Sequence, residues 1–326
     1  MPSPGQFGQT KNKRNSHLIL LGTAGFGVVI FIVGIILLCN TVTVTIDGYE
    51  IVKDYTDCTP TEFEPNQIKC KDKLQATGKE CSCYLLISIT TPMKAPVTVY
   101  YELESYDQIL SNYSQSRDDN QLAGHLSAEP SESCGSHTYS CTAEGRKPIA
   151  PCGRLADAMF NDTFSLQTNN TFVPYNRSGL LSEDDKKQFH NPPGDDLTQV
   201  FKDFSKPMSW RRNVWELDTE DPNNNGFQNE AFIIWMKTDL KRKPVLRVRQ
   251  EKQYEIGLPV ANYTLKITYA YPTSRYDGRR KAIISSVQET VSVNNTAKGF
   301  GIALLLIGLC ISILAGLIIW KRRSAK

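Results

Sequence analysis

The stretch "LILLGTAGFGVVIFIVGIILLC" at residues 18–39 decides the architecture of this chain, because it runs for 22 residues without a charged side chain. A second stretch of the same kind, "FGIALLLIGLCISILAGLIIW", occupies residues 300–320. An α-helix rises about 1.5 Å per residue, so about 20 apolar residues cross the hydrocarbon core of a bilayer. Both stretches are therefore predicted to be transmembrane helices, and not core helices of a soluble protein.

The first stretch also has to be weighed against a cleaved signal peptide. Its apolar run exceeds the roughly 7–15 residues that are typical of a signal-peptide core. The sequence "LLCNTVTVT" that follows contains no small-x-small cleavage motif. We therefore expect a retained membrane anchor.

Basic residues flank both spans and predict the topology. Three precede the first span and four follow the second: Lys11, Lys13 and Arg14, then Lys321, Arg322, Arg323 and Lys326. Positively charged flanks remain in the cytosol. Tails 1–17 and 321–326 are thus expected to be cytosolic, and residues 40–299 to form a lumenal or extracellular domain.

The charge balance argues against nucleic-acid binding. The whole chain has 37 basic and 34 acidic residues, and the flanks hold seven of the basic ones and none of the acidic ones. Residues 40–299 therefore carry 30 basic and 34 acidic side chains, a net charge of −4. The positive total comes from the membrane flanks.

Cysteines and glycosylation sequons agree with this topology. Seven of the nine cysteines lie within residues 40–299, and the other two, Cys39 and Cys310, lie in the spans. All six N-x-S/T sequons lie there too, at Asn112, Asn161, Asn169, Asn176, Asn262 and Asn294. Disulfides and N-glycans form on the oxidising, lumenal side of membranes.

Within residues 40–299, period-two alternation predicts an antiparallel β-sandwich. Six segments are expected as strands: 83–91, 97–104, 231–238, 244–250, 263–271 and 280–288. Residues 194–204 place apolar side chains at helical spacing. The stretch 105–195 is rich in Ser, Asn, Asp, Gly and Pro, which predicts long glycan-bearing loops pinned by disulfides.

The segment "DPNNNGFQNEAFIIWMKT" at residues 221–238 begins like a calcium loop. Asp221, Asn223, Asn225 and Gly226 match the first, third, fifth and sixth positions of an EF-hand. The twelfth position, which needs a bidentate carboxylate, is Phe232. We therefore favour a turn that leads into a buried strand.

Other chemistry finds little support in the sequence. Cys81-x-Cys83 and Cys134-x6-Cys141 lack the paired spacing of structural zinc sites, and disulfides are expected instead. The four histidines join no recognisable catalytic motif, and the adjacent Asp118 and Asp119 are interpreted as a solvated turn. We predict no catalytic residue, metal or cofactor.

Neither span holds an ionisable residue, which argues against a chain that conducts ions by itself. The second span presents small residues along one face, at Gly301, Gly308, Ser312 and Gly316, and the first adds Gly22, Thr23 and Gly27. Such residues allow a second helix to approach closely. They are a candidate seam for a partner helix, although small residues are also common in membrane helices.

Several long motifs resemble the cell cycle control protein fifty family. They are "SRDDNQL" (116–122), "KPIAPCG" (147–153), "MFNDTF" (159–164), "NPPGDDLTQVFKDFSKPMSW" (191–210), the segment 221–238 and "YPTSRYDGRRKAIISS" (271–286). Members are accessory, or beta, subunits of type-four P-type ATPases, the phospholipid flippases. The resemblance runs from the first span to the last.

The resemblance implies two spans around an antiparallel β-sandwich. It also implies a heterodimer with the catalytic alpha subunit, which would hydrolyse ATP and move aminophospholipids, while this chain supports its exit from the endoplasmic reticulum. Carried over residue by residue, Cys58 would pair with Cys83, Cys70 with Cys81, and Cys134 with Cys152. Cys141 would be left over, or would displace Cys134 as the partner of Cys152. Asn161 in "FNDT" matches the glycan position of the family.

Two other classes share parts of this pattern. A two-span ligand-gated channel subunit also has cytosolic termini and a disulfide-rich ectodomain, although uncharged spans argue against it. An adhesion or ligand-binding receptor would bind a soluble ligand without an ATPase.

Overall fold

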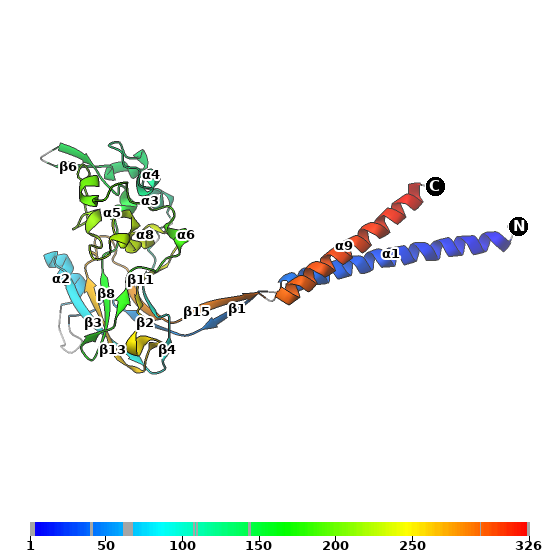
Figure 1. Ribbon diagram of the computed structural model, residues 1–326, viewed down its shortest axis with the longest axis horizontal. Coiled ribbons are helices and arrows are strands. Elements are labelled where there is room, and N and C mark those ends of the chain that lie inside the picture. Colours follow the sequence, from blue (N-terminus) through cyan, green and yellow to red (C-terminus); the bar gives the residue numbers. More distant parts are fainter. Residues whose placement is uncertain are drawn as a thin grey trace. The chain divides into compact units, whose positions relative to one another are not determined.

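The computed structural model describes residues 4–39, 42–60, 68–106, 108, 110–142, 145–293 and 295–324. They form two compact units (Figure 1). The first comprises the described residues up to Asp47 and from Gln288 onward, and the second comprises Gly48–Val287. Asn294, one of the six sequons, lies outside the described residues.

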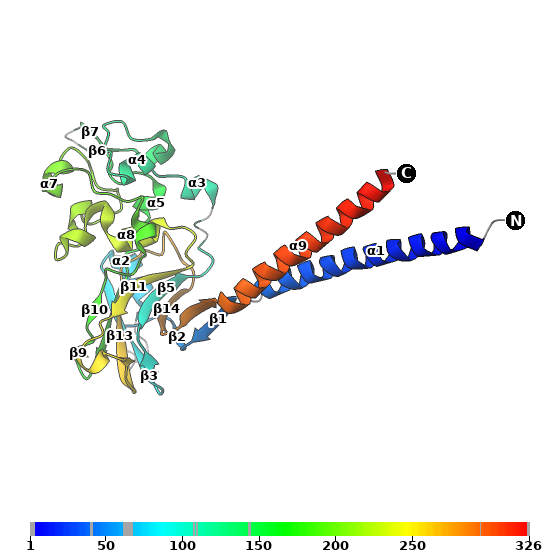
Figure 2. The same cartoon turned by 45° about the vertical axis from the view of Figure 1, so that its right-hand side comes forward.

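The first unit is a pair of helices with a short β-ladder. Helix α1 is Pro4–Cys39 and helix α9 is Asn295–Ser324. Within them, Leu21–Cys39 and Thr296–Lys321 are long and apolar enough to cross a membrane. Strands β1 (Val42–Asp47) and β15 (Gln288–Val293) pair antiparallel beside them. Both views show α1 and α9 side by side near the ladder and diverging towards the two termini (Figures 1 and 2).

The second unit is the expected antiparallel β-sandwich. The five-stranded sheet has the order β10-β11-β5-β14-β2, and the four-stranded sheet has the order β3-β13-β8-β9. The strands of the first sheet are Tyr175–Asn176, Arg242–Val248, Thr98–Leu103, Arg280–Ser285 and Glu50–Asp54. Those of the second are Cys81–Ile89, Ala261–Tyr269, Thr163–Thr168 and Thr171–Phe172.

Aromatic side chains fill the space between the sheets. Tyr101 of β5 stacks on Phe164 of β8 with 6.5 Å between ring centroids, and on Phe160 with 4.1 Å. Tyr55, which follows β2, meets Phe164 edge to face at 5.8 Å. Rings of this size bury large apolar areas, so these contacts hold the two sheets together.

Short elements complete the second unit. Two small sheets pair β4 (Met93–Lys94) with β12 (Gly257–Leu258), and β6 (Tyr139–Thr142) with β7 (Gly145–Pro148). The helices are α2 (Cys70–Thr77), α3 (Ser111–Ser114), α4 (Asp119–Leu122), α5 (Arg154–Asp157), α6 (Glu183–Lys186), α7 (Leu197–Val200) and α8 (Glu230–Met236). Five 3₁₀ turns span Glu132–His137, Val214–Glu216, Pro222–Asn224, Gly226–Gln228 and Lys252–Tyr254. Both views place α3, α4, α5 and α8 together at one end of the strands (Figures 1 and 2).

Five of the six predicted strands are confirmed, and the segment 231–238 is a correction. It forms helix α8, in which Phe232, Ile233 and Trp235 are all buried. A short run that is buried on every side has no period that separates helix from strand. The amide of Asn229 decides the outcome, because it accepts the N–H of Phe232 and so caps a helix.

The stretch 105–195 is also more ordered than predicted. It contains β8, which lies inside the four-stranded sheet, and the helices α3, α4, α5 and α6. In β8, Phe164 and Leu166 are buried and alternate with less buried neighbours. This period-two alternation is visible in the sequence, but the prediction of loops for residues 105–195 used only the composition of the stretch and so missed the strand. The helix expected over residues 194–204 is only the single turn α7.

Candidate functional site

The helix pair brings together part of the predicted small-residue seam. A Cβ atom placed on Gly308 would lie 2.6 Å from the carbonyl oxygen of Gly27 and from the N atom of Phe31. One placed on Gly34 would lie 2.9 Å from the carbonyl oxygen of Gly301. These backbones therefore approach so closely that only glycine fits at the contacts.

The spacing of the contacts gives the packing geometry. Gly27 and Gly34 are seven residues apart on α1, and Gly301 and Gly308 are seven apart on α9. Ala315, seven residues further along α9, is only 5% exposed. A seven-residue repeat of contact positions is typical of left-handed helix pairs.

The helix on the seam is thus the chain's own α1. The hydroxyl of Ser312 donates to the Gly308 carbonyl oxygen at 2.8 Å, and a Cβ atom on Gly27 would lie 2.6 Å from that hydroxyl. Gly316 and Gly22 are different, because a Cβ atom on either would meet no described atom within 4 Å. Thr23 is exposed. The structure uses Gly27, Gly301, Gly308 and Ser312 within the chain, whereas Gly22 and Gly316 meet open space among the described residues and stay candidate contacts for a second protein.

Three disulfides brace the second unit. They join Cys58 to Cys83, Cys70 to Cys81, and Cys134 to Cys152, the pairs that the family resemblance implies. Cys141 is free and exposed on β6. The first two disulfides fasten the segment before α2 and the start of α2 to strand β3, and the third joins the turn that precedes β6 to the segment that follows β7.

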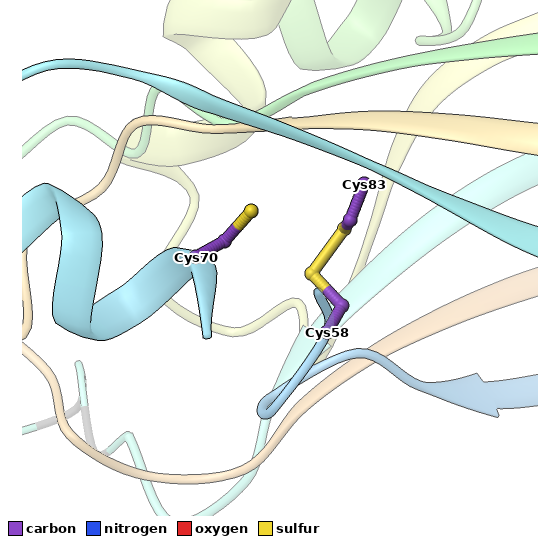
Figure 3. Close-up of side chains that lie close together, drawn as sticks. All are labelled: Cys58, Cys70 and Cys83. Carbon is purple, nitrogen blue, oxygen red and sulfur yellow. A yellow bond between two sulfur atoms is a disulfide. The ribbon is translucent and has the colours of Figure 1, made fainter. Parts of the chain in front are cut away.

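The sulfur atoms of Cys58, Cys70 and Cys83 lie within 4.8 Å of one another (Figure 3). Three thiolates at this separation could hold a metal ion. Here each sulfur already belongs to a disulfide, since Cys70 is bonded to Cys81. A disulfide sulfur is not a thiolate, so this cluster is two adjacent disulfides and not a metal centre.

The calcium-like segment is held by its own side chains. Asp221 accepts the N–H of Asn223, and Asn225 accepts the N–H of Gly226 and donates to the Trp215 carbonyl. Phe232 is fully buried. The oxygens that would ligate calcium instead satisfy the backbone, as they do in tight turns.

The carboxylates of Asp118 and Asp119 separate in the structure. Asp118 is 7% exposed and accepts the N–H groups of Gln121 and Ser131, so it caps helix α4. This corrects the expectation of a solvated turn, which holds only for Asp119, whose exposed carboxylate pairs with Arg117 at 2.8 Å. The cap has a physical reason, because the first N–H groups of a helix need acceptors.

Asp157 joins three segments of the second unit, a role that the sequence does not signal. Its carboxylate accepts the N–H and hydroxyl of Ser209, at 2.9 and 2.8 Å. It also pairs with Arg275 at 3.0 Å, and Nε2 of His137 lies 3.7 Å away. His125 and His190, by contrast, are exposed. The carboxylate is therefore engaged in holding loops together.

The deepest polar group is the pair of Asp162 and Arg280. Both side chains are fully buried and their charged atoms lie 3.0 Å apart. Asp162 also accepts the N–H groups of Ala270 and Tyr271 and the hydroxyl of Tyr55. Burial raises the pKa of the Asp162 carboxyl, and the Arg280 charge opposes that shift. Such a network rigidifies the end of the sandwich at which β14 begins.

Sequons occupy exposed positions wherever the structure describes them. Asn112 lies on α3, Asn161 precedes β8, and Asn169 follows β8 with a positive φ of 49°. Asn176 is on β10 and Asn262 on β13, and both are exposed. An exposed asparagine is a necessary condition for an N-glycan.

Together these features define a class: a two-span membrane protein whose helices pack on each other and whose β-sandwich is braced by disulfides. The model of the LEM3 (ligand-effect modulator 3) family, also called the CDC50 family, matches residues 28–324. The chain belongs to this family.

Curated relatives agree with the match. The chain is 35% identical over 303 residues to cell cycle control protein 50A of Mus musculus, covering 89% of this chain and 80% of that protein. It is 39% identical over 252 residues to cell cycle control protein 50B of Homo sapiens, covering 73% and 70%. It is 31% identical over 269 residues to ALA-interacting subunit 3 of Arabidopsis thaliana, covering 80% and 69%.

Proposed function

We propose that this chain is the non-catalytic accessory subunit of a phospholipid-flipping P-type ATPase. One observation carries the proposal: the family match extends from residue 28, within the first apolar helix, to residue 324, and so includes part of that helix, the second apolar helix and the domain between them. The shared feature is thus the arrangement of a domain between two apolar segments. The plant relative is named an interacting subunit, which supports the assignment of this chain as a subunit of a complex.

In this proposal the two helices lie beside the membrane helices of the ATPase, and the sandwich lies on its lumenal or extracellular side. The basic flanks support cytosolic termini. Disulfides and exposed sequons support a lumenal domain within the secretory pathway, from the endoplasmic reticulum to the Golgi, endosomes or plasma membrane. ATP hydrolysis and lipid movement belong to the partner.

A rigid accessory domain acts on its partner by binding one conformation better than another. The disulfides and the buried ion pair of Asp162 and Arg280 give this domain a fixed shape. A fixed surface makes its affinity sensitive to the conformation of the ATPase. The chain would thereby stabilise the ATPase for exit from the endoplasmic reticulum and for its transport cycle.

Co-purification tests the proposal. Tagged chain from gently solubilised membranes should recover a P-type ATPase in equal molar amount, identified by mass spectrometry. Co-expression should raise the amount of that ATPase beyond the endoplasmic reticulum. Repeated recovery of the chain alone, or ion currents from the purified chain in a bilayer, would overturn the proposal.

A further inference from the structure

We infer that the exposed apolar tip formed by Ile256 and Val260 inserts into the headgroup region of the membrane. Ile256 is 81% exposed, the largest exposure among the large apolar side chains of the described residues, and Val260 is 57% exposed. Both belong to the short loop that links β11 to β13. The inference goes beyond the proposed function, because it assigns a lipid contact to this chain itself.

The loop is built to hold these two side chains outward. Tyr254 is 3% exposed and Leu258 is 1% exposed, so buried anchors alternate with Ile256 and Val260. The carbonyl of Ile256 accepts the N–H of Ala95 at 2.9 Å, and Gly257–Leu258 pairs with Met93–Lys94. Two apolar groups are thus presented on a fixed support.

Strand register places the tip at the end of the second unit from which the chain continues to both helices. Strand β2 begins at Glu50, which pairs with Ser285 at the end of β14. Ser285 pairs in turn with Thr98, the first residue of β5, and Thr98 pairs with Arg247, near the end of β11. The loop after β11, which carries the tip, therefore starts at the same end of the sheet as Gly48 and Val287.

A direct contact supports the same placement. The hydroxyl of Tyr49 donates to the carbonyl oxygen of Thr91, two residues before β4. Tyr49 is the second residue of the unit, and β4 is the strand that pairs with β12 beside the tip. Eight residues separate Gly48 from Cys39, where the span Leu21–Cys39 ends. Eight extended residues reach at most about 26–29 Å, so the length of the chain limits how far this end of the second unit can lie from the end of the span.

The small net charge around the tip predicts that insertion does not require anionic lipid. Lys94, Arg249 and Lys252 are exposed near it, and Glu251 and Glu255 offset two of these three positive charges. Exposed apolar side chains at a membrane-facing tip gain free energy by entering the headgroup and acyl boundary. The small net charge adds little attraction to acidic headgroups. The ligand is therefore a phospholipid surface, recognised mainly through apolar contact.

Lipid quenching tests the inference in the full-length chain, without any partner. A fluorescent nitrobenzoxadiazole label is placed by Ile256→Cys or Val260→Cys in a chain with Cys39, Cys141 and Cys310 changed to serine. The chain is reconstituted into phosphatidylcholine vesicles that contain headgroup-spin-labelled lipid. Met208→Cys is the matched control, because Met208 is 58% exposed and its neighbour Ser209 binds Asp157. Asp157 pairs with Arg275, which lies in the connection between β13 and β14. This connection is at the end of these strands opposite to the tip, so a label at residue 208 reports on the other end of the domain.

We expect quenching at residues 256 and 260 to exceed that at residue 208 by at least about two-fold, with little change when a third of the lipid is phosphatidylserine. Equal quenching at all three sites overturns the inference. So does quenching that appears only after Asn262→Gln, since a glycan two residues from Val260 would then keep the native tip from lipid. Protection that appears only when an ATPase is bound also overturns it, in favour of a protein contact. The first two outcomes do not bear on whether the chain is an ATPase subunit, and the third would overturn the lipid contact while supporting that role.

Discussion

The guanidinium of Arg280 and the carboxylate of Asp162 lie 3.0 Å apart inside the sandwich, and neither side chain is exposed to solvent. The guanidinium also donates to the carbonyls of Tyr271 and Tyr276, and it lies 4.1 Å from the ring centroid of Tyr269. Removal of one partner from such a buried pair leaves an uncompensated charge in the interior, which destabilises the fold strongly.

The first prediction concerns this pair. Arg280→Leu leaves the Asp162 carboxylate buried without its counter-charge, so the variant should lose about 3–5 kcal/mol of stability. The urea midpoint of the purified chain in detergent, followed by tryptophan fluorescence, measures the loss. Arg279→Leu is the control, because Arg279 is 63% exposed and pairs with Asp54 at the surface. An equal shift for both variants would show that burial of the pair is not the cause.

A second prediction concerns the helix seam. Gly308→Leu places a side chain where a Cβ atom already lies 2.6 Å from the backbone of α1, so the helices must separate. Overpacking of this kind costs about 1–3 kcal/mol. The distance between spin labels on α1 and α9 should increase in lipid nanodiscs. Gly316→Leu introduces the same side chain where the described structure leaves space, and the distance should stay unchanged. Unchanged distances in both variants would refute the seam.

The third prediction is a pH dependence. Lys243 donates to the carbonyls of Ile234, Trp235 and Lys237, at the end of α8. Burial lowers the pKa of its amine from 10.5 to about 7. Between these two values the unfolded chain binds more protons at this site than the folded chain, so stability rises with pH across this window and is flat below it.

The measurement compares the chain with its Lys243→Met variant between pH 7 and 9.5. The difference in the free energy of unfolding should change with a slope of up to about 1.4 kcal/mol per pH unit, in favour of the chain that retains lysine at the higher pH. Tyrosines titrate alike in the two proteins, so their contribution cancels in this difference. Parallel curves for the two proteins would mean that Lys243 keeps an ordinary pKa.

A fourth prediction separates the capping role of the asparagines from metal binding. Asn229 is 4% exposed, and its amide accepts the Phe232 N–H and donates to the Asn224 carbonyl. Asn229→Ala should cost about 1–2 kcal/mol, as for other lost helix caps. Millimolar calcium or a chelator should leave the melting temperature of the unchanged chain unaltered. A rise with calcium would restore the metal interpretation of residues 221–232.

A fifth prediction concerns the cysteines. The disulfide between Cys134 and Cys152 joins residues that are 18 apart in the sequence. Cys152→Ser removes this disulfide and should lower the free energy of unfolding by about 3 kcal/mol. Cys141→Ser should leave stability and tryptic disulfide-linked peptides unchanged, because Cys141 is free. A Cys141–Cys152 peptide in the unchanged chain would contradict this pairing.

Features that depend on local pattern were predictable from the sequence. Two uncharged runs of about 20 residues have no stable place except a membrane, and period-two alternation is visible in strands such as Ala261–Tyr269. The motifs from residue 116 to residue 286 were sufficient to indicate the family.

Tertiary structure alone decided the rest. The apolar run after Asn229 forms a helix and not a strand because Asn229 caps its first turn and because its apolar side chains are buried in the tertiary structure. The glycine seam faces the chain's own α1, and Asp162 meets Arg280 across 118 residues of sequence. These outcomes rest on contacts between distant segments, and no local pattern encodes which distant surface a side chain will meet.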